Sequence, residues 1–240
     1  MSSRRPTTTR RRDRIPSRYA ETPTALFERA VHERLAPGIA VLDVGGGRHP
    51  AVPAEALGGI TRYVGLDLST DELDAAPPGI YTETRVADLT RRVDDLVGAF
   101  DLIVSRQVLE HVSDMAATLE NVRAYLRPGG HLVAMLSGAL ALQAVLNRVI
   151  PAPVGRRLMH NLLGRATDSV FPAYYDRCRH SALIQLLEPW RTAEIEPMYQ
   201  GGAYLNFSPL LRYGYLAYEG WACRTARADL ATHYVIVAGR

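Results

Sequence analysis

Short apolar runs separated by helical or glycine-rich pieces are the feature of this sequence that most limits its fold. From residue 39 onward the runs are rich in β-branched residues and too short to be helices. Such an alternation is typical of buried parallel strands joined by helices. The predicted strands are 39–44, 61–68, 81–89, 100–105 and 131–136, with two closing strands at 191–199 and 232–240. The sequence therefore predicts an α/β fold.

The pieces between the first five strands fit crossover helices. They span 51–58, 69–75, 90–97 and 107–126. The last is the clearest, because apolar residues recur at helical spacing until the Arg127–Gly130 turn ends it. Further apolar helices are predicted at 137–164 and 176–188, and an aromatic stretch at 204–222 lies between the two closing strands.

Residues 1–20 have almost no apolar content and are predicted to be a disordered basic tail. Its arginines are Arg4, Arg5, Arg10, Arg11, Arg12, Arg14 and Arg18. They account for much of the basic excess behind the net charge of +3, so the rest of the chain is close to neutral and offers no basic stripe for a specific nucleic acid. Residues 21–240 have an ordinary globular composition and are predicted to form one domain.

The sequence gives no sign of export, membrane insertion or metal binding. The basic start is not followed by the apolar stretch of a secretory signal, and the chain has no run of the ~18 apolar residues that suggests a membrane helix. Cys178 and Cys223 lie far apart and match no zinc or disulfide spacing. A cytoplasmic protein without a metal site is therefore expected.

The first predicted strand runs into three glycines, Gly45, Gly46 and Gly47. Glycines at this place let the backbone turn sharply and let a ligand approach the amides that follow. Asp43, two positions before the first glycine, would repel a pyrophosphate but attract a ligand that carries an ammonium and a sulfonium. The alternative is that Asp43 only caps the next helix.

Two more carboxylates follow the next strands. Asp67 ends the second strand, where an acidic side chain can accept hydrogen bonds from both ribose hydroxyls of an adenosine, and Leu68 comes directly after it. Asp88 ends the third strand and could accept from an adenine amino group while Leu89 packs on the ring. The alternatives are a helix cap for Asp67 and an exposed turn for Asp88.

Five segments occur together in the order and spacing of one enzyme family. They are VLDVGGGRHP, YVGLDLS, RVADLT, FDLIVSRQVLEHV and YLRPGGHLVA. Over residues 40–135 the chain resembles the class I S-adenosylmethionine-dependent methyltransferases. The resemblance implies a Rossmann-like sheet of seven mostly parallel strands with an antiparallel last strand, helices on both faces and helical lid insertions. His49 departs from the pattern, because many members have another glycine there.

The resemblance also implies S-adenosylmethionine as the cofactor and assigns residues to it. By that similarity Gly45 and Gly47 line its methionine end, with Gly46 between them also at the cofactor, Asp67 holds the ribose, and Asp88 with Leu89 frames the adenine. Ser105 and Arg106, at the end of the fourth strand, border the methionine and the acceptor. Residues 40–136 would then be the cofactor-binding half, and residues 137–240 the acceptor and lid half.

Methyl transfer from a sulfonium is an in-line displacement with a good leaving group, so the protein mainly has to orient the reactants. A general base is needed only for an acceptor such as a hydroxyl. His111 and His180 are the candidates, with a structural role as the alternative for both.

The apolar insertions at 137–170 and 200–222 favour a small-molecule acceptor such as a sugar, a lipid or a secondary metabolite. Arginines among them would also permit peripheral contact with an anionic membrane. They are Arg148, Arg156, Arg157 and Arg165. Two other interpretations remain open: an NAD-dependent oxidoreductase, which would use Asp67 in the same way but is disfavoured by Asp43, and a cofactor-binding domain without catalysis.

Overall fold

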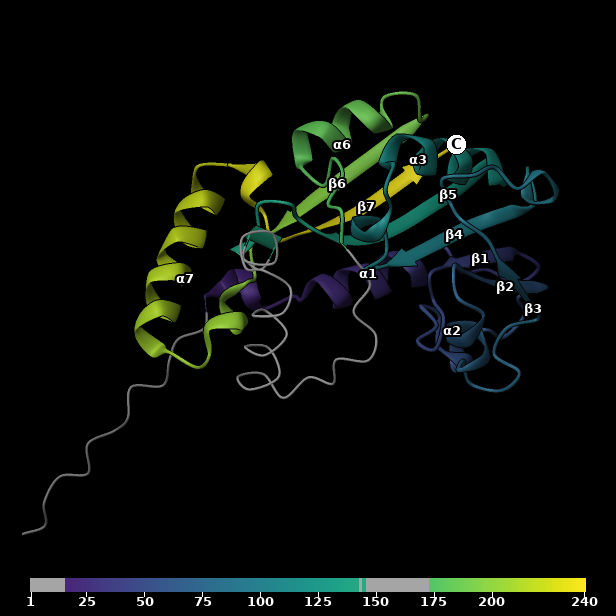
Figure 1. The fold of residues 1–240 in the computed structure, drawn as a ribbon, viewed down its shortest axis with the longest axis horizontal. Helices are drawn as coiled ribbons and strands as arrows, with labels where there is room; N and C mark the ends of the chain where they lie inside the picture. Colours follow the sequence, from purple (N-terminus) through teal and green to yellow (C-terminus); the bar gives the residue numbers. More distant parts are fainter. Residues whose placement is uncertain (1–15, 143, 146–172) are drawn as a thin grey trace, which may run out of the picture.

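A seven-stranded sheet in the order β3–β2–β1–β4–β5–β7–β6 forms the centre of the molecule (Figure 1). The computed structural model describes residues 16–142, 144–145 and 173–240. The strands are β1 Ala40–Val44, β2 Arg62–Asp67, β3 Glu83–Val86, β4 Phe100–Arg106, β5 Leu126–Ser137, β6 Thr192–Met198 and β7 His233–Gly239. β7 is antiparallel to both of its neighbours, and the other paired strands are parallel. The predicted fold class is therefore confirmed.

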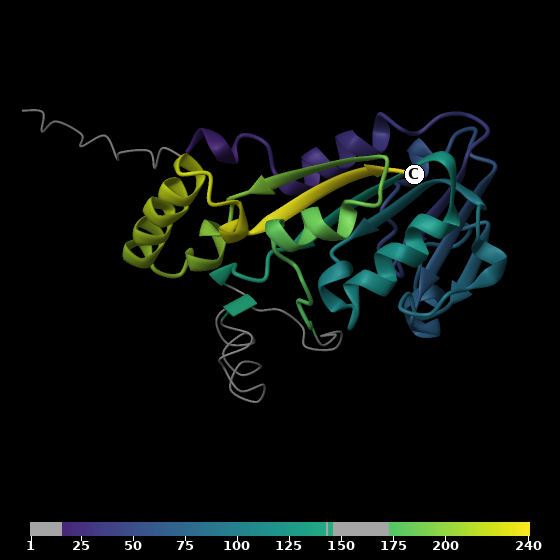
Figure 2. The same ribbon diagram turned by 90° about the horizontal axis from the view of Figure 1, so that it is seen from above.

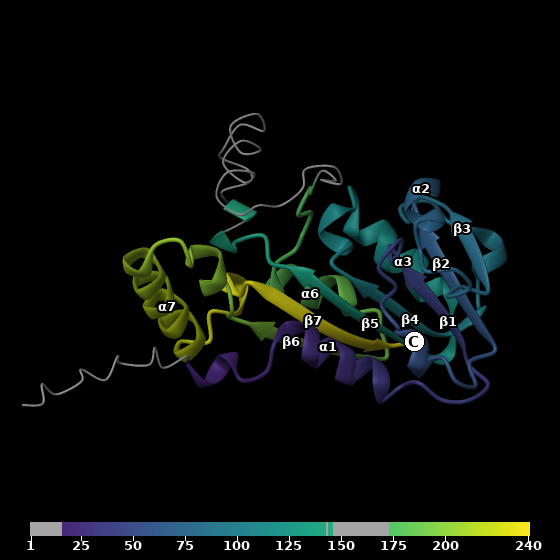
Figure 3. The ribbon, with the colours of Figure 1, turned by 90° about the horizontal axis from the view of Figure 1, so that it is seen from below.

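Helices cover both faces of the sheet, as predicted. The described α-helices are α1 Pro23–His32, α2 Thr70–Asp74, α3 Met115–Tyr125, α6 His180–Leu187 and α7 Pro209–Arg224, the last of which lies beyond one end of the sheet (Figure 1). Figures 2 and 3 show α1 on one face and α3 with α6 on the other. Successive residues of a strand point to opposite faces, so Val41 joins the core under α1 while Leu42 joins the core under α3 and α6.

Helix α1 is missing from the sequence prediction, although local signals mark its start. The hydroxyl of Thr22 accepts a hydrogen bond from the backbone N–H of Ala25 at 3.1 Å, and Pro23 occupies the first helical position. Both features favour a helix start. Phe27 and Val31 on its inner side are buried against the sheet.

The predicted crossover helices at 51–58 and 90–97 are wrong, because each contains only a single 3-10 turn, Ala54–Ala56 and Asp94–Leu96. The helix predicted at 107–126 begins only at Met115, where Asp114 caps it. Before it, Gln107 has a φ of 59°, a left-handed conformation that does not continue into a helix. Most of the predicted helix at 137–164 lies outside the described residues.

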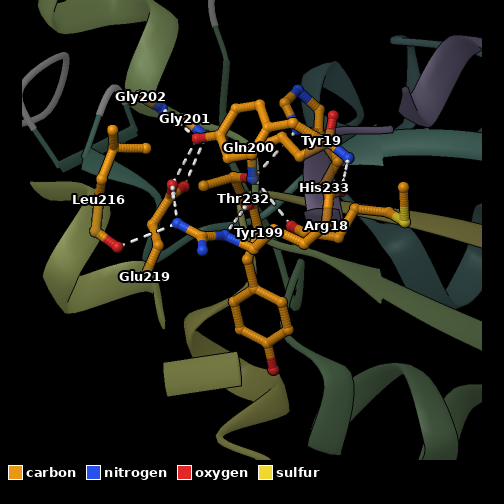
Figure 4. Close-up of polar contacts among 11 residues, drawn as sticks. Arg18, Tyr19, Tyr199, Gln200, Gly201, Gly202, Leu216, Glu219, Thr232 and His233 are labelled. Atoms are coloured by element: carbon orange, nitrogen blue, oxygen red, sulfur yellow. Dashed lines mark hydrogen bonds and ion pairs between the residues drawn. The ribbon is translucent and has the colours of Figure 1, made fainter. Parts of the chain in front are cut away.

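Figure 4 shows how the end of the predicted tail packs against α7. Residues 1–15 lie outside the described residues, whereas Arg18 and Tyr19 are described. The buried carboxylate of Glu219 accepts from the hydroxyl of Tyr19 at 2.5 Å and from the backbone N–H of Gly201 at 2.5 Å, and it lies 3.5 Å from the Arg18 guanidinium. We call Arg18, Tyr19, Gly201 and Glu219 the Glu219 clasp.

The Glu219 clasp should contribute measurably to stability. Glu219→Gln removes the only anion that Arg18 pairs with among the described residues, so a partly buried cation loses its counter-charge. We expect the free energy of unfolding to fall by about 2–4 kcal/mol in urea denaturation. Glu120→Gln, on an exposed position of α3, is the matched control and should change little. Equal stability of the two variants would contradict a stabilising clasp.

Candidate active site

The glycine turn lies at the centre of the carboxyl edge of the parallel strands. β1 pairs with β2 on one side and with β4 on the other. From β1 the chain adds β2 and β3 on one side and then returns to add β4 and β5 on the other, so the strand order switches direction between β1 and β4. Ligands of open α/β sheets bind at such a switch point. Gly45 and Gly47 have φ values of 70° and 42°, and the turn closes through a hydrogen bond from the N–H of His49 to the carbonyl of Gly46 at 2.7 Å. His49 in place of a glycine therefore still permits the turn.

The glycine turn has no room for side chains. A Cβ atom on Gly45 would lie 2.3 Å from Val108 Cγ2, and one on Gly46 would lie 2.4 Å from the hydroxyl oxygen of Tyr81. A Cβ on Gly47 would approach Asp67 Oδ2 to 3.2 Å. The backbone of the turn is thus packed directly against Val108, Tyr81 and Asp67, the last of which was expected to border the cofactor.

Asp43 is fully buried beneath the glycine turn. Its Oδ2 accepts from the Tyr63 hydroxyl at 2.5 Å, the Ala51 N–H at 2.7 Å and the Tyr81 hydroxyl at 3.2 Å. Its Oδ1 has no hydrogen-bond partner in the described residues. Burial raises the pKa of Asp43 to about 6. None of these donors is the start of a helix, so the helix-cap alternative for Asp43 is wrong.

Asp67 ends β2 and faces the same turn. Its Oδ1 accepts from the N–H of Ser69 at 3.0 Å, and burial raises its pKa. The cap of α2 is Ser69, whose hydroxyl accepts from the N–H of Glu72 at 3.3 Å, so Asp67 is not the helix cap. Leu68, directly after it, has 64% of its surface exposed and offers an apolar platform beside the carboxylate.

Ser105 and Arg106 reach the turn from the end of β4. Ser105 pairs with Val44 in the sheet, is buried, and leaves its hydroxyl without a hydrogen-bond partner in the described residues. The Arg106 guanidinium donates to the carbonyls of His49 and Pro50, both at 3.3 Å. Arg106 thereby ties the end of β4 to the loop after the glycines.

Asp88 and Leu89 lie farther along the same edge, after β3. Asp88 Oδ1 accepts from the N–H of Thr90 at 2.9 Å and from its hydroxyl at 2.8 Å, and these bonds hold the pKa of Asp88 below its usual value. Asp88 therefore lies in a turn, as the alternative to adenine binding had predicted. Leu89 is buried, and its carbonyl accepts from the Asn121 amide at 2.9 Å.

The two histidines occupy different places. His111 lies in the 3-10 turn Leu109–His111, which comes after β4 and directly after Val108 in the chain. The side chain of Val108 lies against Gly45 in space. His180 begins α6, with its ring 6.3 Å from that of Tyr234 in β7. The contacts described for His180 do not join it to the glycine turn.

Four polar side chains of the site are missing from the sequence prediction. Tyr63 and Tyr81 hold Asp43 across 20 and 38 positions, which no local pattern indicates. At the ends of β4 and β5, Gln107 accepts from the Ser137 hydroxyl at 2.8 Å and Glu110 accepts from its N–H at 3.2 Å. Glu110 is buried, which raises its pKa, and its Oε2 has no hydrogen-bond partner in the described residues. A glutamate within an apolar helical pattern was the available signal.

Comparison with known proteins identifies the family. The model of a family described as a methyltransferase domain matches residues 11–187. The ubiquinone biosynthesis O-methyltransferase of Xanthomonas axonopodis pv. citri (strain 306) is 29% identical over 180 residues, which cover 67% of this chain and 72% of that protein.

Two solved structures share the fold. Geranyl diphosphate C-methyltransferase from Streptomyces coelicolor A3(2), in complex with Mg²⁺, geranyl-S-thiolodiphosphate and S-adenosyl-L-homocysteine, has a TM-score of 0.56 at 15% identity and aligns with 90% of this chain and 76% of its own. Phosphoethanolamine N-methyltransferase 2 of Haemonchus contortus, in complex with S-adenosyl-L-methionine, has a TM-score of 0.53 at 16% identity, with 89% of this chain aligned. The chain spans 52% of the length of that protein.

The family match covers more than half of the sequence, so the chain belongs to this methyltransferase family. It is a class I S-adenosylmethionine-dependent methyltransferase, as the resemblance implied, rather than an NAD-dependent oxidoreductase or a non-catalytic domain. Two observations fit this cofactor. The turn has room for glycine backbone but not for side chains. In addition, the buried oxygens Asp43 Oδ1 and Ser105 Oγ have no hydrogen-bond partner in the described residues.

Two observations bear on metals and membranes. Within the described residues, no three His, Cys, Asp or Glu side chains are grouped so that they could bind a metal ion. None of the described helices combines the length and the apolar character that crossing a bilayer requires.

The close packing of Gly46 gives a direct test of the turn. Gly46→Ala would place a Cβ within 2.5 Å of Asp43 Oδ2 and within 2.4 Å of the Tyr81 hydroxyl. We expect the turn to shift and the affinity for S-adenosylhomocysteine, measured by calorimetry, to fall at least ~10-fold, because a displacement that costs about 1.4 kcal/mol of binding is sufficient. Gly58→Ala, where no atom lies within 4 Å of the added Cβ, should bind normally. Normal binding by both variants would contradict this assignment of the turn.

Proposed function

We propose that this enzyme transfers the methyl group of S-adenosylmethionine to a hydroxyl of a small, largely apolar molecule, such as a lipid, a sugar derivative or a secondary metabolite. The observation that carries this proposal is the polar cluster of Gln107, Glu110 and Ser137 at the ends of β4 and β5. It belongs to the segment that touches Gly45 through Val108, at the methionine end of the proposed cofactor site. The name of the Xanthomonas relative, an O-methyltransferase, favours the same chemistry.

Each site residue has a proposed role. The backbone of the glycine turn receives the methionine part, and the Asp43 carboxylate attracts its ammonium through the field of a buried charge. Asp67 accepts from the ribose hydroxyls, while Leu68, Asp88 and Leu89 border the adenine. Ser105 and Arg106 bound the methionine and the acceptor. Residues 40–136 thus hold the cofactor, and residues 137–240 cover the acceptor.

When bound, the cofactor supplies an activated methyl on a sulfonium, so the chain has three tasks: alignment, exclusion of water and removal of a proton from the acceptor. A hydroxyl is a poor nucleophile until its proton leaves. We assign removal of that proton to His111 rather than His180, because His111 lies in the turn that directly follows Val108, whose side chain adjoins Gly45. Glu110 is buried and interacts electrostatically with His111, so we assign to its carboxylate the stabilisation of the imidazolium that results.

The experiment is a mass-shift screen of acceptor classes with the purified enzyme, covering phenols with apolar tails, sugars, amines and nucleic acid. We expect hydroxylated apolar compounds to gain a methyl group. With the best acceptor, His111→Asn should lower kcat about 10²-fold, whereas His180→Asn should retain most of the activity. Methylation of amines or nucleic acid alone, or equal losses in the two histidine variants, would contradict the proposal.

A further inference from the structure

His233 lies at the carboxyl edge of the parallel strands, next to Ser137. It is the first residue of β7 and is paired in the sheet with Ser137, the last residue of β5. Directly opposed residues of antiparallel strands point to the same face, with their Cβ atoms about 4.5–5.5 Å apart. This face is the one under α1, because Val235 and Met135, two positions along each strand, belong to the core there. The imidazole and the Ser137 hydroxyl therefore share one face of the sheet at this edge.

Ser137 belongs to the polar cluster that carries the proposed function. Its hydroxyl donates to the side-chain oxygen of Gln107 at 2.8 Å. Gln107 directly precedes Val108, whose side chain lies against Gly45. A row of contacts thus extends from the glycine turn across the ends of β4 and β5 to His233 on β7.

The hydrogen bonds of Thr232 determine which ring nitrogen of His233 carries the proton (Figure 4). The Thr232 hydroxyl donates its only proton to the Met198 carbonyl at 2.8 Å and accepts from the Gln200 N–H at 2.8 Å. The third neighbour of this hydroxyl oxygen is His233 Nδ1, at 3.2 Å. Because the hydroxyl has no second proton to give, Nδ1 must carry a proton and donate it to the oxygen.

The other ring nitrogen of His233, Nε2, is therefore a hydrogen-bond acceptor. Burial lowers the pKa of His233 to about 4, so the ring is neutral near pH 7. No described residue makes a hydrogen bond to Nε2, and the side chain is partly exposed. A neutral imidazole in this tautomer favours a ligand group that donates a hydrogen bond, such as a hydroxyl or an N–H.

We propose that His233 binds the methyl acceptor, with Nε2 accepting a hydrogen bond from a second hydroxyl or N–H group of that molecule. The hydroxyl that is methylated then lies at the cluster of Gln107, Glu110 and Ser137, and the second donor lies about one strand spacing away, toward β7. Acceptors with both groups bind more tightly than acceptors with only one. The inference rests on the proposed function, because it places the acceptor at this cluster.

The test uses two probes that differ by one hydroxyl, 4-hexylresorcinol and 4-hexylphenol. The two oxygens of the resorcinol lie about one strand spacing apart, ~4.8 Å. Each probe is titrated by calorimetry into the full chain saturated with S-adenosylhomocysteine. We expect the wild type to bind the resorcinol at least ~5-fold more tightly than the phenol, because only the resorcinol can donate to Nε2.

Two variants of His233 separate its hydrogen bond from its packing. His233→Phe keeps an aromatic ring but removes Nε2, and it should bind the two probes equally. His233→Gln places an amide oxygen where Nε2 lies, and it should keep part of the preference for the resorcinol. His131→Phe is the matched control, because His131 lies at the opposite end of the same pair of strands, across from Gly239. It should keep the full preference.

All three variants should bind S-adenosylhomocysteine as the wild type does, which shows that their fold is intact. Equal binding of the two probes by the wild type, or an unchanged preference in His233→Phe, would overturn the role of His233 even if the enzyme methylates hydroxyl groups. A preference that depends on His233, in an enzyme that methylates no hydroxyl in the acceptor screen, would support this site and overturn the proposed function.

Discussion

Asp67→Ala is expected to lower the affinity for S-adenosylhomocysteine by about two to three orders of magnitude, since two hydrogen bonds to a charged group contribute roughly 3–4 kcal/mol together. The carboxylate of Asp67 ends β2 and faces Gly47, and its Oδ1 accepts from the Ser69 N–H at 3.0 Å. We propose that this carboxylate also accepts hydrogen bonds from the ribose diol. Calorimetric titration of the purified protein measures the change directly.

The matched control for Asp67 is Asp71→Ala, which removes an exposed carboxylate from the first turn of α2. It tests whether loss of a negative charge near the site is enough to weaken binding. We expect its affinity to stay within a factor of ~3 of the wild type, because exposed charges are screened by water and salt. Similar losses in the two variants would show that Asp67 acts only through its charge and not by holding the ribose.

Asp43→Asn is expected to separate stability from cofactor binding. The variant keeps an oxygen that can accept from Tyr63, Tyr81 and Ala51, so the glycine turn should remain in place. It loses the buried negative charge that we propose attracts the cofactor ammonium. We expect the affinity for S-adenosylmethionine at pH 7.5 to fall at least ~10-fold, because an unscreened buried charge contributes well over 1.4 kcal/mol.

The stability of the same variant should change in the opposite direction. The pKa of Asp43 is raised from 3.8 to about 6 by burial, so the folded protein binds this proton more tightly than the unfolded chain. That contribution to stability is fully present below pH 3.8 and is lost as the pH rises through about 6. Above pH 6 the buried charge lowers the free energy of unfolding of the wild type by up to ~3 kcal/mol. The neutral amide of the Asp43→Asn variant avoids this loss but buries an N–H group without a hydrogen-bond partner.

Without cofactor at pH 7.5, Asp43→Asn should therefore be at least as stable as the wild type in urea denaturation. Its free energy of unfolding should be higher by up to about 2 kcal/mol. The advantage should shrink as the pH falls toward 4, where Asp43 of the wild type is neutral. The cofactor affinity of the wild type should also decrease below pH 6. A variant that is less stable at pH 7.5, or that binds the cofactor normally, would contradict the role of a buried attracting charge.

The sequence predicted the strands well because buried parallel strands are continuous apolar runs. The pattern placed β1, β2 and β4 within one residue of their ends. The segments 51–58 and 90–97 have similar composition to helices, but Gly59 and Gly98 directly after them have positive φ values of 88° and 65°, a conformation that does not continue a helix. Helix periodicity gave α3 correctly and failed at its start, where Gln107 adopts a positive φ.

The partners of the buried carboxylates could not be predicted, because they are far apart in the sequence. Asp43 depends on Tyr63 and Tyr81, and Glu219 depends on Arg18, which is 201 positions away. Arg18 belonged to a segment whose composition indicated disorder. The aromatic stretch at 204–222 became α7, and nothing in its sequence indicated that Leu210 and Trp221 would lie exposed.

The most direct test of the account is a calorimetric comparison of S-adenosylhomocysteine binding by the wild type, Asp67→Ala, Asp43→Asn and Gly58→Ala, with NAD⁺ titrated into the wild type. We predict binding of S-adenosylhomocysteine at one site per chain in the wild type and Gly58→Ala, strong losses in the two aspartate variants, and no binding of NAD⁺. Equal affinity for S-adenosylhomocysteine in all four proteins would contradict the assignment of the cofactor to the glycine turn between β1 and β4.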